Sequence, residues 1–429
     1  MVKGFPSRFA FNNNARVRRA FPICRRGVHF PCLPGVGPSI LTNMNDITRR
    51  HFTQSLAAAP AAFLMGCADR GNESASRSQA DGADPWDGYD GAMVVDALAS
   101  PGPFNVQNRT GQPLSAEMVA NARASGITAV NVTANGGGGT PEEAYEATLG
   151  HLEYWDRETA THPDVLRLAS SVTEIHEAKD AGQLALVLGF QDTFMLGTDV
   201  ERLDEFHAKG VKIIQLTYNV PNLVGEGCLS PSNGGLTDFG KTLVEAMEDR
   251  GVLVDLSHCG QRTTAEAIVL AAGPVSITHS GCKAIYDHPR SKRDEELRAL
   301  ADKGGVVGIY MMPFLNAEGP PTAEDLYLHI EHAVNLCGED HVGIGSDNST
   351  TPTAADEAYL AGLKAFAEER QRLGIGAPRE HEVLFVPELN APERMEMIGE
   401  GLIARGHSAS RVEKVIGGNW MRLFGEVWG

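Results

Sequence analysis

Short apolar runs alternate with longer amphipathic segments along most of the chain after residue 91. Each run is rich in Val and Ile and is bounded by Gly or polar residues, which is typical of buried strands. Eight such runs occupy residues 92–98, 127–133, 184–191, 211–218, 251–258, 274–280, 306–312 and 341–347. Helical patterns separate most of them, at residues 141–161, 200–209, 238–250, 261–272, 294–303 and 322–336.

Eight strands that alternate with helices predict an α/β fold, a (β/α)8 TIM-type barrel. The competing architecture is a doubly wound open sheet, but no G-x-G-x-x-G motif follows the first predicted strand. Residues 348–429 predict a C-terminal helical extension, with helices at 392–405 and 410–416. A last helical segment opens at residues 417–420, and we expect it to pack under the barrel.

The N-terminal residues differ from the rest of the chain in pattern and in charge. Residues 1–66 contain nine Lys or Arg and a single acid, Asp46, whereas the whole chain has a formal net charge of −18. The acidic body argues against nucleic acid as a partner, because phosphate binding requires clustered Lys and Arg. We therefore interpret the first 66 residues separately from the fold.

An export signal is predicted at residues 44–67. Arg49 and Arg50 precede a short apolar stretch at 56–66, and Cys67 follows at once. This order is typical of a secretory signal, and the paired arginine favours export of a folded protein. The residues before Cys67 resemble a lipoprotein box, which predicts a lipid anchor on Cys67 and a periplasmic or membrane-anchored bacterial protein. A chance coincidence of these features within an ordinary signal peptide is the alternative.

The remaining boundaries follow from composition. Residues 1–43 show no apolar periodicity, and Met44 is a sensible start for the signal, so an upstream mis-start is one explanation of this leader. Residues 68–90 are rich in Gly, Ser, Asp and Ala and predict a flexible linker. Residues 91–429 form the predicted barrel domain.

Four cysteines remain in the body, Cys228, Cys259, Cys282 and Cys337. Their spacing fits neither a zinc ribbon nor a disulfide-rich scaffold, so we expect buried or loosely paired cysteines. Cys259 follows His258 directly. Adjacent strand residues point to opposite faces, so we do not expect both to face one metal ion.

The active sites of such barrels form at the C-terminal ends of the strands. His258 and His279 end neighbouring predicted strands, and Asp347 ends the strand two further on. One histidine at a strand end is most often a structural residue, but two on adjacent strands with an acid nearby favour a shared functional site. Because zinc readily accepts imidazole ligands, the pair is a candidate divalent metal site.

The residues around these strand ends carry a family resemblance. The matching segments are Asp255-Leu256-Ser257-His258, Ile277-Thr278-His279-Ser280, Asp287-His288-Pro289-Arg290, Gly-Gly-Val-Val at 304–307, Val-Gly-Ile-Gly-Ser-Asp at 342–347 and Gly-Gly-Asn-Trp at 417–420. In residue type and spacing they resemble the membrane (renal) dipeptidase family of zinc peptidases, in the amidohydrolase superfamily. The resemblance covers residues 92–425 and is densest from 236 to 347.

The resemblance implies a two-zinc barrel that hydrolyses dipeptides, in which two metals lower the pKa of a bridging water and polarise the scissile carbonyl. Residue by residue, it implies that His258 and His279 ligate one of the metals. It implies that Arg290 binds the substrate carboxylate through its fork of donors. It also implies that Asp347 meets the substrate amino group and handles the proton, and that the protein is a homodimer.

The first half of the chain departs from the family pattern. Leu98 and Ser100 stand where the family has a His-x-Asp pair after the first strand. Gln191 stands in place of the metal-bridging Glu, and Tyr218 in place of the polarising His. Leucine cannot ligate a metal, and neutral Ser and Gln are poor replacements for carboxylates. A binuclear centre of the family type is therefore not expected.

What remains can hold at most one zinc ion, or none. His258 and His279 would need Asp347 or Asp192 as a third ligand, with a water in the open position. Tyr218 can donate a hydrogen bond, or act as an acid, at a developing oxyanion. A packed strand-end aromatic is the alternative interpretation of Tyr218.

The sequence thus predicts an exported hydrolase that resembles membrane dipeptidases and acts on dipeptides or peptide-like small molecules, with a mononuclear or absent metal site. Two alternatives stay open: a non-hydrolytic periplasmic enzyme that tailors a peptide natural product, and a peptide-binding pseudo-enzyme. The expected partners are a small peptide-like substrate and a membrane, reached through the lipid anchor on Cys67.

Overall fold

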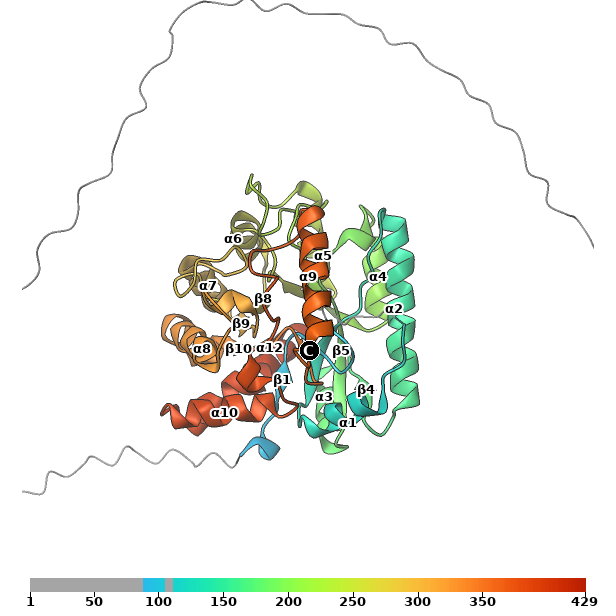
Figure 1. The fold of residues 1–429 in the computed structure, drawn as a ribbon. Coiled ribbons are helices and arrows are strands. Elements are labelled where there is room, and N and C mark those ends of the chain that lie inside the picture. Colours follow the sequence, from blue (N-terminus) through green and yellow to red (C-terminus); the bar gives the residue numbers. More distant parts are fainter. Residues whose placement is uncertain (1–87, 105–110) are drawn as a thin grey trace, which may run out of the picture. The chain divides into compact units, whose positions relative to one another are not determined.

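The fold is given by a computed structural model that describes residues 88–104 and 111–429 (Figure 1). All of these residues belong to the unit Arg77–Gly429. The predicted leader at 1–43, the predicted signal at 44–67 with its lipidation residue Cys67, and the predicted linker up to residue 87 lie outside the described residues.

Eight parallel strands form a closed barrel. They are β1 (Val95–Asp96), β3 (Ala129–Thr133), β5 (Leu184–Phe190), β6 (Val211–Gln215), β7 (Leu253–Asp255), β8 (Ser276–Ser280), β9 (Val306–Ile309) and β10 (Val342–Ile344). The order around the sheet is β3-β1-β10-β9-β8-β7-β6-β5, and the pairing of β3 with β5 closes the ring. Every one of these strands lies within a predicted apolar run, so the predicted (β/α)8 barrel is confirmed.

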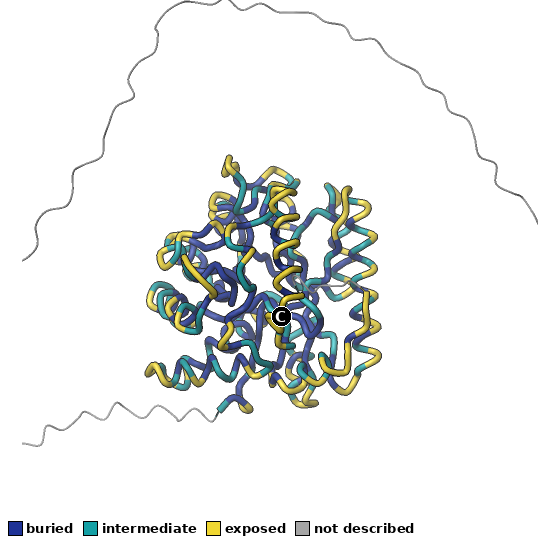
Figure 2. Tube along the Cα trace, in the orientation of Figure 1, coloured by how far each residue is buried: buried dark blue, intermediate teal, exposed yellow. Residues whose placement is uncertain are grey.

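The helices that cover the barrel begin and end close to their predicted positions. They are α2 (Pro141–Thr161), α4 (Glu201–Ala208), α5 (Asp238–Asp249), α6 (Gln261–Leu270), α7 (Asp294–Asp302) and α8 (Ala323–Cys337). Local chemistry fixes the starts: Thr140 and Glu143 form a reciprocal capping box at the beginning of α2, with Pro141 in the first turn. The buried chain trace gathers inside this layer, and the exposed positions lie on its outer faces (Figure 2).

Several elements escaped the sequence analysis. They are α1 (Ala116–Ala124), α3 (Val172–Asp180), α9 (Glu357–Arg372), the short strand β4 (Leu166–Leu168), and the pair β2 (Ala99–Ser100) and β11 (Asn348–Ser349). Helix α1 shows why, because Ala122 is the one residue along it that is buried. A helix with so little apolar surface has no periodicity for sequence analysis to detect.

The C-terminal extension closes the N-terminal end of the barrel. It comprises α10 (Arg394–Ala404), α11 (Ala409–Glu413), a π-helical turn (Lys414–Gly418) and α12 (Asn419–Trp428). Trp420 is fully buried among residues near the strand starts, such as Val95 and Leu253, and its Nε1 donates to the carbonyl of Ile344 at 3.1 Å. The prediction that this segment packs under the barrel is confirmed.

The folded body begins slightly before the predicted end of the linker. Tyr89 starts a 3-10 turn (Tyr89–Gly91), is buried, and donates its hydroxyl hydrogen to the carbonyl of Ser125 at 2.8 Å. Along the described residues, no helix combines the length and the apolar character needed to cross a membrane.

Candidate functional site

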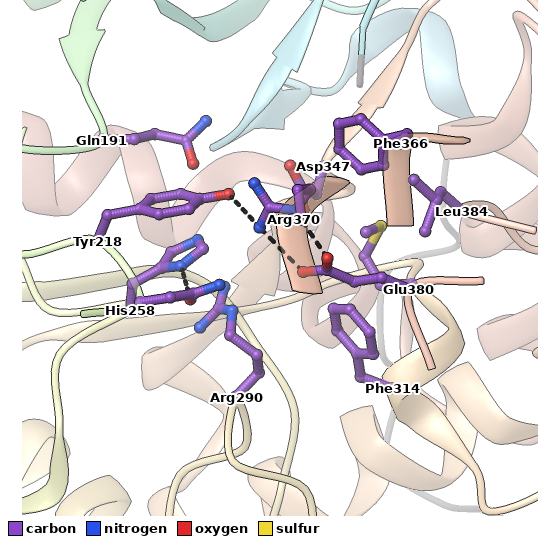
Figure 3. A pocket seen from close by; sticks show the side chains of 12 residues that line it. Gln191, Tyr218, His258, Arg290, Phe314, Asp347, Phe366, Arg370, Glu380 and Leu384 are labelled. Atoms are coloured by element: carbon purple, nitrogen blue, oxygen red, sulfur yellow. Dashed lines mark hydrogen bonds and ion pairs between the residues drawn. The ribbon is translucent and has the colours of Figure 1, made fainter. Parts of the chain in front are cut away.

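A small cavity lies at the carboxyl ends of the barrel strands (Figure 3). Its volume is about 50 Å³. The barrel lines it with Gln191, Tyr218, Asn219, His258, Arg290 and Asp347, and the C-terminal part of the chain lines it with Phe366, Arg370, Glu380 and Leu384. This end of the strands is where a (β/α)8 barrel places its active site.

His258 and His279 meet next to this cavity. His279 lies within β8, and His258 follows β7; their Nε2 atoms face each other 2.9 Å apart. Both side chains are buried. Burial, reinforced by the Arg290 guanidinium, holds the pKa of both imidazoles well below the usual range. Both rings are therefore neutral at pH 7, and one of them donates to the other.

Asn219 decides which ring donates. Its Nδ2 donates to the carbonyl of Ile375 at 2.8 Å, so its Oδ1 is an acceptor, and this oxygen lies 2.6 Å from His258 Nδ1. His258 Nδ1 therefore carries the hydrogen, and a neutral His258 presents a lone pair on Nε2. His279 Nε2 then donates to His258, and His279 Nδ1 lies 2.9 Å from the Thr278 hydroxyl oxygen.

Asp255 ties the two strand ends together. Its Oδ1 accepts hydrogen bonds from the Ser257 hydroxyl at 2.7 Å and from the Thr278 backbone N–H at 2.8 Å. Its Oδ2 lies 2.8 Å from the Thr278 hydroxyl oxygen. Burial raises the pKa of Asp255. The Thr278 hydroxyl therefore lies between the Asp255 carboxyl and His279 Nδ1.

The histidine pair fits one metal ion with open coordination positions. The Nε2 atoms converge, and His258 Nδ1 donates to Asn219 Oδ1, as is usual for a metal-ligating histidine. To ligate through Nε2, His279 would carry its hydrogen on Nδ1, where the Thr278 hydroxyl oxygen can accept it. Zinc–nitrogen bonds of about 2.0–2.1 Å would separate the two Nε2 atoms by about 3.3 Å. The rings would therefore move apart by only a few tenths of an ångström, and the hydrogen bond between them would be lost.

The positions of the other expected metal ligands are occupied by residues with different contacts. Leu98 is buried in the core, the Ser100 hydroxyl accepts from the Gly102 N–H at 3.0 Å, and the Gln191 Nε2 donates to Thr133 Oγ1 at 2.7 Å. Asp192, one expected third ligand, already accepts from Asn222 Nδ2 at 2.7 Å. Over residues 88–104 and 111–429, no group of three or more His, Cys, Asp or Glu side chains is placed to hold a metal ion.

Arg290 is fixed against the cavity wall. Its Nη1 donates to the carbonyl of Ser257 at 2.6 Å, and its Nη2 donates to the carbonyl of His279 at 3.4 Å. The side chain is buried. A guanidinium has five N–H donors, so these two bonds orient the group and still leave donors for a carboxylate in the cavity.

Asp347 follows β10 in an unusual backbone conformation, with φ at 61°. A non-glycine residue in this region is strained, and such strain is concentrated at functional sites. Its N–H donates to the carbonyl of Leu98 at 2.8 Å. Burial raises the pKa of Asp347 to about 7, although the Arg290 guanidinium opposes the shift. The carboxyl can therefore exchange a proton near neutral pH.

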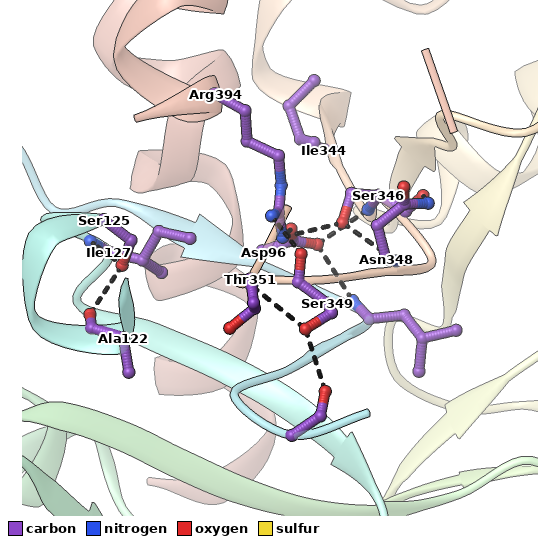
Figure 4. A network of polar contacts seen from close by, with 12 residues as sticks. Asp96, Ala122, Ser125, Ile127, Ile344, Ser346, Asn348, Ser349, Thr351 and Arg394 are labelled. Carbon is purple, nitrogen blue, oxygen red and sulfur yellow. Dashed lines mark hydrogen bonds and ion pairs between the residues drawn. The ribbon is translucent and has the colours of Figure 1, made fainter. Parts of the chain in front are cut away.

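A buried ion pair supports the backbone beside Asp347 (Figure 4). Arg394 Nη2 lies 3.0 Å from Asp96 Oδ2 and 3.1 Å from Ser346 Oγ, and Arg394 Nη1 donates to the carbonyl of Ser349 at 2.6 Å. Asp96 Oδ1 accepts from the Ser346 N–H at 2.7 Å. Asp96 is thus a buried structural carboxylate that joins β1 to the segment following β10.

Tyr218 lies in the cavity and stacks on His258, with ring centroids 4.2 Å apart. Its hydroxyl oxygen accepts a hydrogen bond from Arg370 Nη2 at 3.2 Å. Arg370 is held in turn by Glu380, with Nε–Oε2 at 2.7 Å and Nη2–Oε1 at 2.9 Å. Figure 3 shows the three side chains in a row across the cavity.

Arg370 and Glu380 are site residues that the sequence pattern does not predict. They come from α9 and the loop after it, which was expected only as a loop with further helices. No motif marks them, because the end of α9 and an irregular turn separate the two partners in the sequence. The role of Asn219 as the partner of His258 is visible only in the tertiary structure, where its Nδ2 donates to the carbonyl of Ile375 and its Oδ1 faces the imidazole.

Two of the four body cysteines, Cys259 and Cys282, are buried, and Cys228 Sγ donates to Asn219 Oδ1 at 3.3 Å. Cys228, Cys259, Cys282 and Cys337 are free thiols. The Cys259 sulfur accepts from the Thr217 hydroxyl at 3.4 Å inside the core, whereas His258 lines the cavity. The two neighbours therefore face opposite sides, as expected.

The chain is similar to known dipeptidases. Residues 97–359 match the family model described as membrane dipeptidase, peptidase family M19. The dipeptidase verJ of Clonostachys rogersoniana is 31% identical over 207 residues, which is 48% of this chain and 53% of that protein. A crystal structure of an amidohydrolase from Pseudomonas aeruginosa has a TM-score of 0.68 and 29% identity, and covers 80% of this chain and 98% of its own.

A Rhodobacter sphaeroides metallopeptidase, solved with a phosphinate mimic of the dipeptide L-Ala-D-Ala, shares the fold at a TM-score of 0.64. Its identity is 18%, with 79% of this chain and 99% of that chain covered. This chain spans 53% to 60% of the length of three curated dipeptidases that it matches.

Proposed function

The chain belongs to the membrane dipeptidase family, peptidase family M19, and on this premise we propose that it hydrolyses dipeptides or peptide-like small molecules at the cavity beside His258 and His279. One observation carries the proposal. A fixed cation, Arg290, and a titratable carboxyl, Asp347, line the same cavity as the phenol of Tyr218. This set is complementary to the carboxylate, the amino group and the scissile carbonyl of a dipeptide.

Each side chain has a role in this proposal. Arg290 binds the terminal carboxylate and so fixes the position of the peptide bond. Asp347 contacts the amino group, accepts a proton from the attacking water and returns it to the leaving nitrogen as the C–N bond breaks. The Tyr218 hydroxyl donates to the carbonyl oxygen while that oxygen becomes negative.

We also propose that at most one zinc ion binds, with His258 and His279 as its protein ligands. When bound, zinc supplies Lewis-acid polarisation and a more acidic water. The support is the convergence of the two Nε2 atoms and the engagement of the opposite nitrogen of each ring. The changed residues at positions 98, 100 and 191 argue against a second ion, since two zinc ions carry four positive charges that need carboxylates nearby.

The test combines metal content with turnover. Protein purified without chelators should contain no more than one zinc per chain and should release amino acids from some members of a dipeptide panel. His258→Ala and Arg290→Met should abolish the turnover, whereas Arg372→Gln, a change on the exposed side of α9, should leave it intact. Two zinc ions per chain would refute the reduced metal site.

A binding protein without turnover is the second candidate. The observation in its favour is the replacement of family metal ligands by Leu98, Ser100 and Gln191, because a cavity that keeps Arg290 can still bind a carboxylate after the metal chemistry is reduced. A folded protein that binds dipeptides but cleaves none of them would support this candidate and refute hydrolysis. A non-hydrolytic tailoring enzyme would instead convert a larger peptide without cleaving it.

Export and membrane attachment are further proposals. Their support is the order of Arg49-Arg50, the apolar stretch at 56–66 and Cys67 in the sequence. Cys67→Ala should release the protein from the membrane fraction of the expressing bacterium; an equal distribution of both forms would refute the lipid anchor. The homodimer is proposed from the family alone, and light scattering on the purified protein tests it.

A further inference from the structure

The guanidinium of Arg370 sits between two aromatic rings at the edge of the cavity. Its Cζ lies 5.4 Å from the centroid of the Tyr218 ring and 5.1 Å from that of Phe366. The residue belongs to the last turn of α9, and the side chain reaches the barrel, where its Nη2 donates to the Tyr218 hydroxyl oxygen. Arg370 is thus a contact between the C-terminal cover and the strand-end site.

Several contacts fix this guanidinium in place. Glu380 binds it with both carboxylate oxygens, and the two side chains are 13% and 7% exposed. The loop that carries Glu380 is tied to the barrel side by Asn219 Nδ2, which donates to the carbonyl of Ile375, and by Arg379 Nε, which donates to the carbonyl of Pro313 at 2.8 Å. The position of Arg370 relative to Tyr218 is therefore set by the fold.

This arrangement determines what the Tyr218 hydroxyl can do. A phenol has one hydrogen to donate, and its oxygen can accept, whereas arginine only donates. Because Arg370 donates to the oxygen, the hydroxyl hydrogen has to point elsewhere. It points away from the Arg370 guanidinium, and the ring that carries it lines the cavity, so the hydrogen can be offered to a ligand there.

We propose that Arg370 is a positioning residue, which acts through Tyr218 by turning its O–H toward the substrate carbonyl oxygen and by supporting the negative charge that develops there. This rests on the proposed hydrolysis. In the reaction, water adds to the carbonyl carbon, the C=O pair moves to oxygen, and the Tyr218 hydrogen bond shortens onto that oxyanion. The C=O double bond re-forms when the C–N bond breaks. Arg370 itself exchanges no proton.

The Arg370–Tyr218 arrangement affects mainly the energy of the transition state. A donor aimed at the oxyanion strengthens only when charge develops, so its loss lowers kcat and leaves KM nearly unchanged. Loss of one oxyanion donor typically costs about 10²–10³ in kcat. If Arg370 instead bound the substrate carboxylate directly, its loss would weaken substrate and transition-state binding equally.

The experiment is a double-mutant cycle, read by kinetics and by the affinity of a phosphinate dipeptide analogue, whose anionic oxygen imitates the oxyanion. The variants are Tyr218→Phe, Arg370→Gln/Glu380→Gln and the combination of both. The paired change at 370 and 380 removes both charges, so no unpaired ion stays buried. Arg370→Lys keeps a donor and a charge, and Arg372→Gln on the same helix is the matched control.

We expect Tyr218→Phe to lower kcat and phosphinate affinity about 100-fold, with KM changed less than about threefold. The paired variant Arg370→Gln/Glu380→Gln should lower kcat and phosphinate affinity as well, and adding Tyr218→Phe to it should be no worse than Tyr218→Phe alone. Arg370→Lys should lose less of both quantities than the paired variant. Additive losses, or an equal loss of dipeptide and phosphinate binding, would overturn the positioning role. If the wild-type protein binds no phosphinate and cleaves no dipeptide, the proposed function fails first, and this inference falls with it.

Discussion

The Asp96–Arg394 pair offers a sharp test of how the site is supported. Both side chains are almost completely buried, at 0% and 3% exposure, and the guanidinium makes hydrogen bonds to Asp96, Ser346 and Ser349. Arg394→Met keeps an apolar side chain about as long as the arginine stem and removes the guanidinium with its charge. The carboxylate of Asp96 is then left in the core without a cation.

The expected cost follows from these contacts. Removal of one partner of a buried ion pair typically destabilises by about 3–5 kcal/mol, mainly because the remaining charge is poorly solvated. Arg394 Nε has no hydrogen-bond partner among the described residues. The wild-type pair is therefore imperfect, and we expect the lower end, about 3 kcal/mol. Because Asp96 holds the N–H of Ser346, we also expect the orientation of Asp347 to become less well defined.

Urea unfolding followed by tryptophan fluorescence measures the change in the free energy of unfolding. Asp96→Asn combined with Arg394→Met removes both charges and keeps an acceptor for Ser346, so it should recover at least half of the loss. Arg372→Met, on the exposed pair with Glu369, should change nothing measurable. A loss below about 1 kcal/mol in the single variant, or a paired variant equally unstable, would refute the argument.

Three further changes test the chemistry of the cavity. The pKa of Asp347 is raised to about 7, so its basic form increases with pH: kcat/KM should rise through pH 7, and Asp347→Asn should remove both the rise and the activity; a flat profile in the wild type would contradict this role. Asn219→Ala should weaken zinc binding about 10–100-fold in a competition titration, because His258 Nδ1 loses its partner, and unchanged affinity would exclude this support. Restoration of the family ligands should raise the zinc content from at most one to two ions per chain, measured by mass spectrometry; unchanged content would show that more than ligand type was lost. The restoring changes are Leu98→His, Ser100→Asp and Gln191→Glu.

The sequence by itself determined the barrel and the location of the site. Parallel strands buried on both faces require continuous apolar runs, and a chain that alternates such runs with amphipathic helices has few ways to bury them. His258, His279 and Asp347 could be placed at the strand ends for the same reason, since the strand period and the barrel rule fix where a strand-end residue lies. Arg290 could be predicted as a site residue because it lies in a short motif, eleven residues after His279.

Only the tertiary structure decided what surrounds these residues. Arg370 and Glu380 lie more than 100 residues after Tyr218, on a segment whose local pattern gives no sign that it reaches the barrel. The donor roles of His258 and His279 depend on Asn219, whose own orientation is set by the carbonyl of Ile375. Hydrogen-bond direction and the pKa of a buried group depend on which atoms lie within a few ångströms, and long-range packing brings those atoms together.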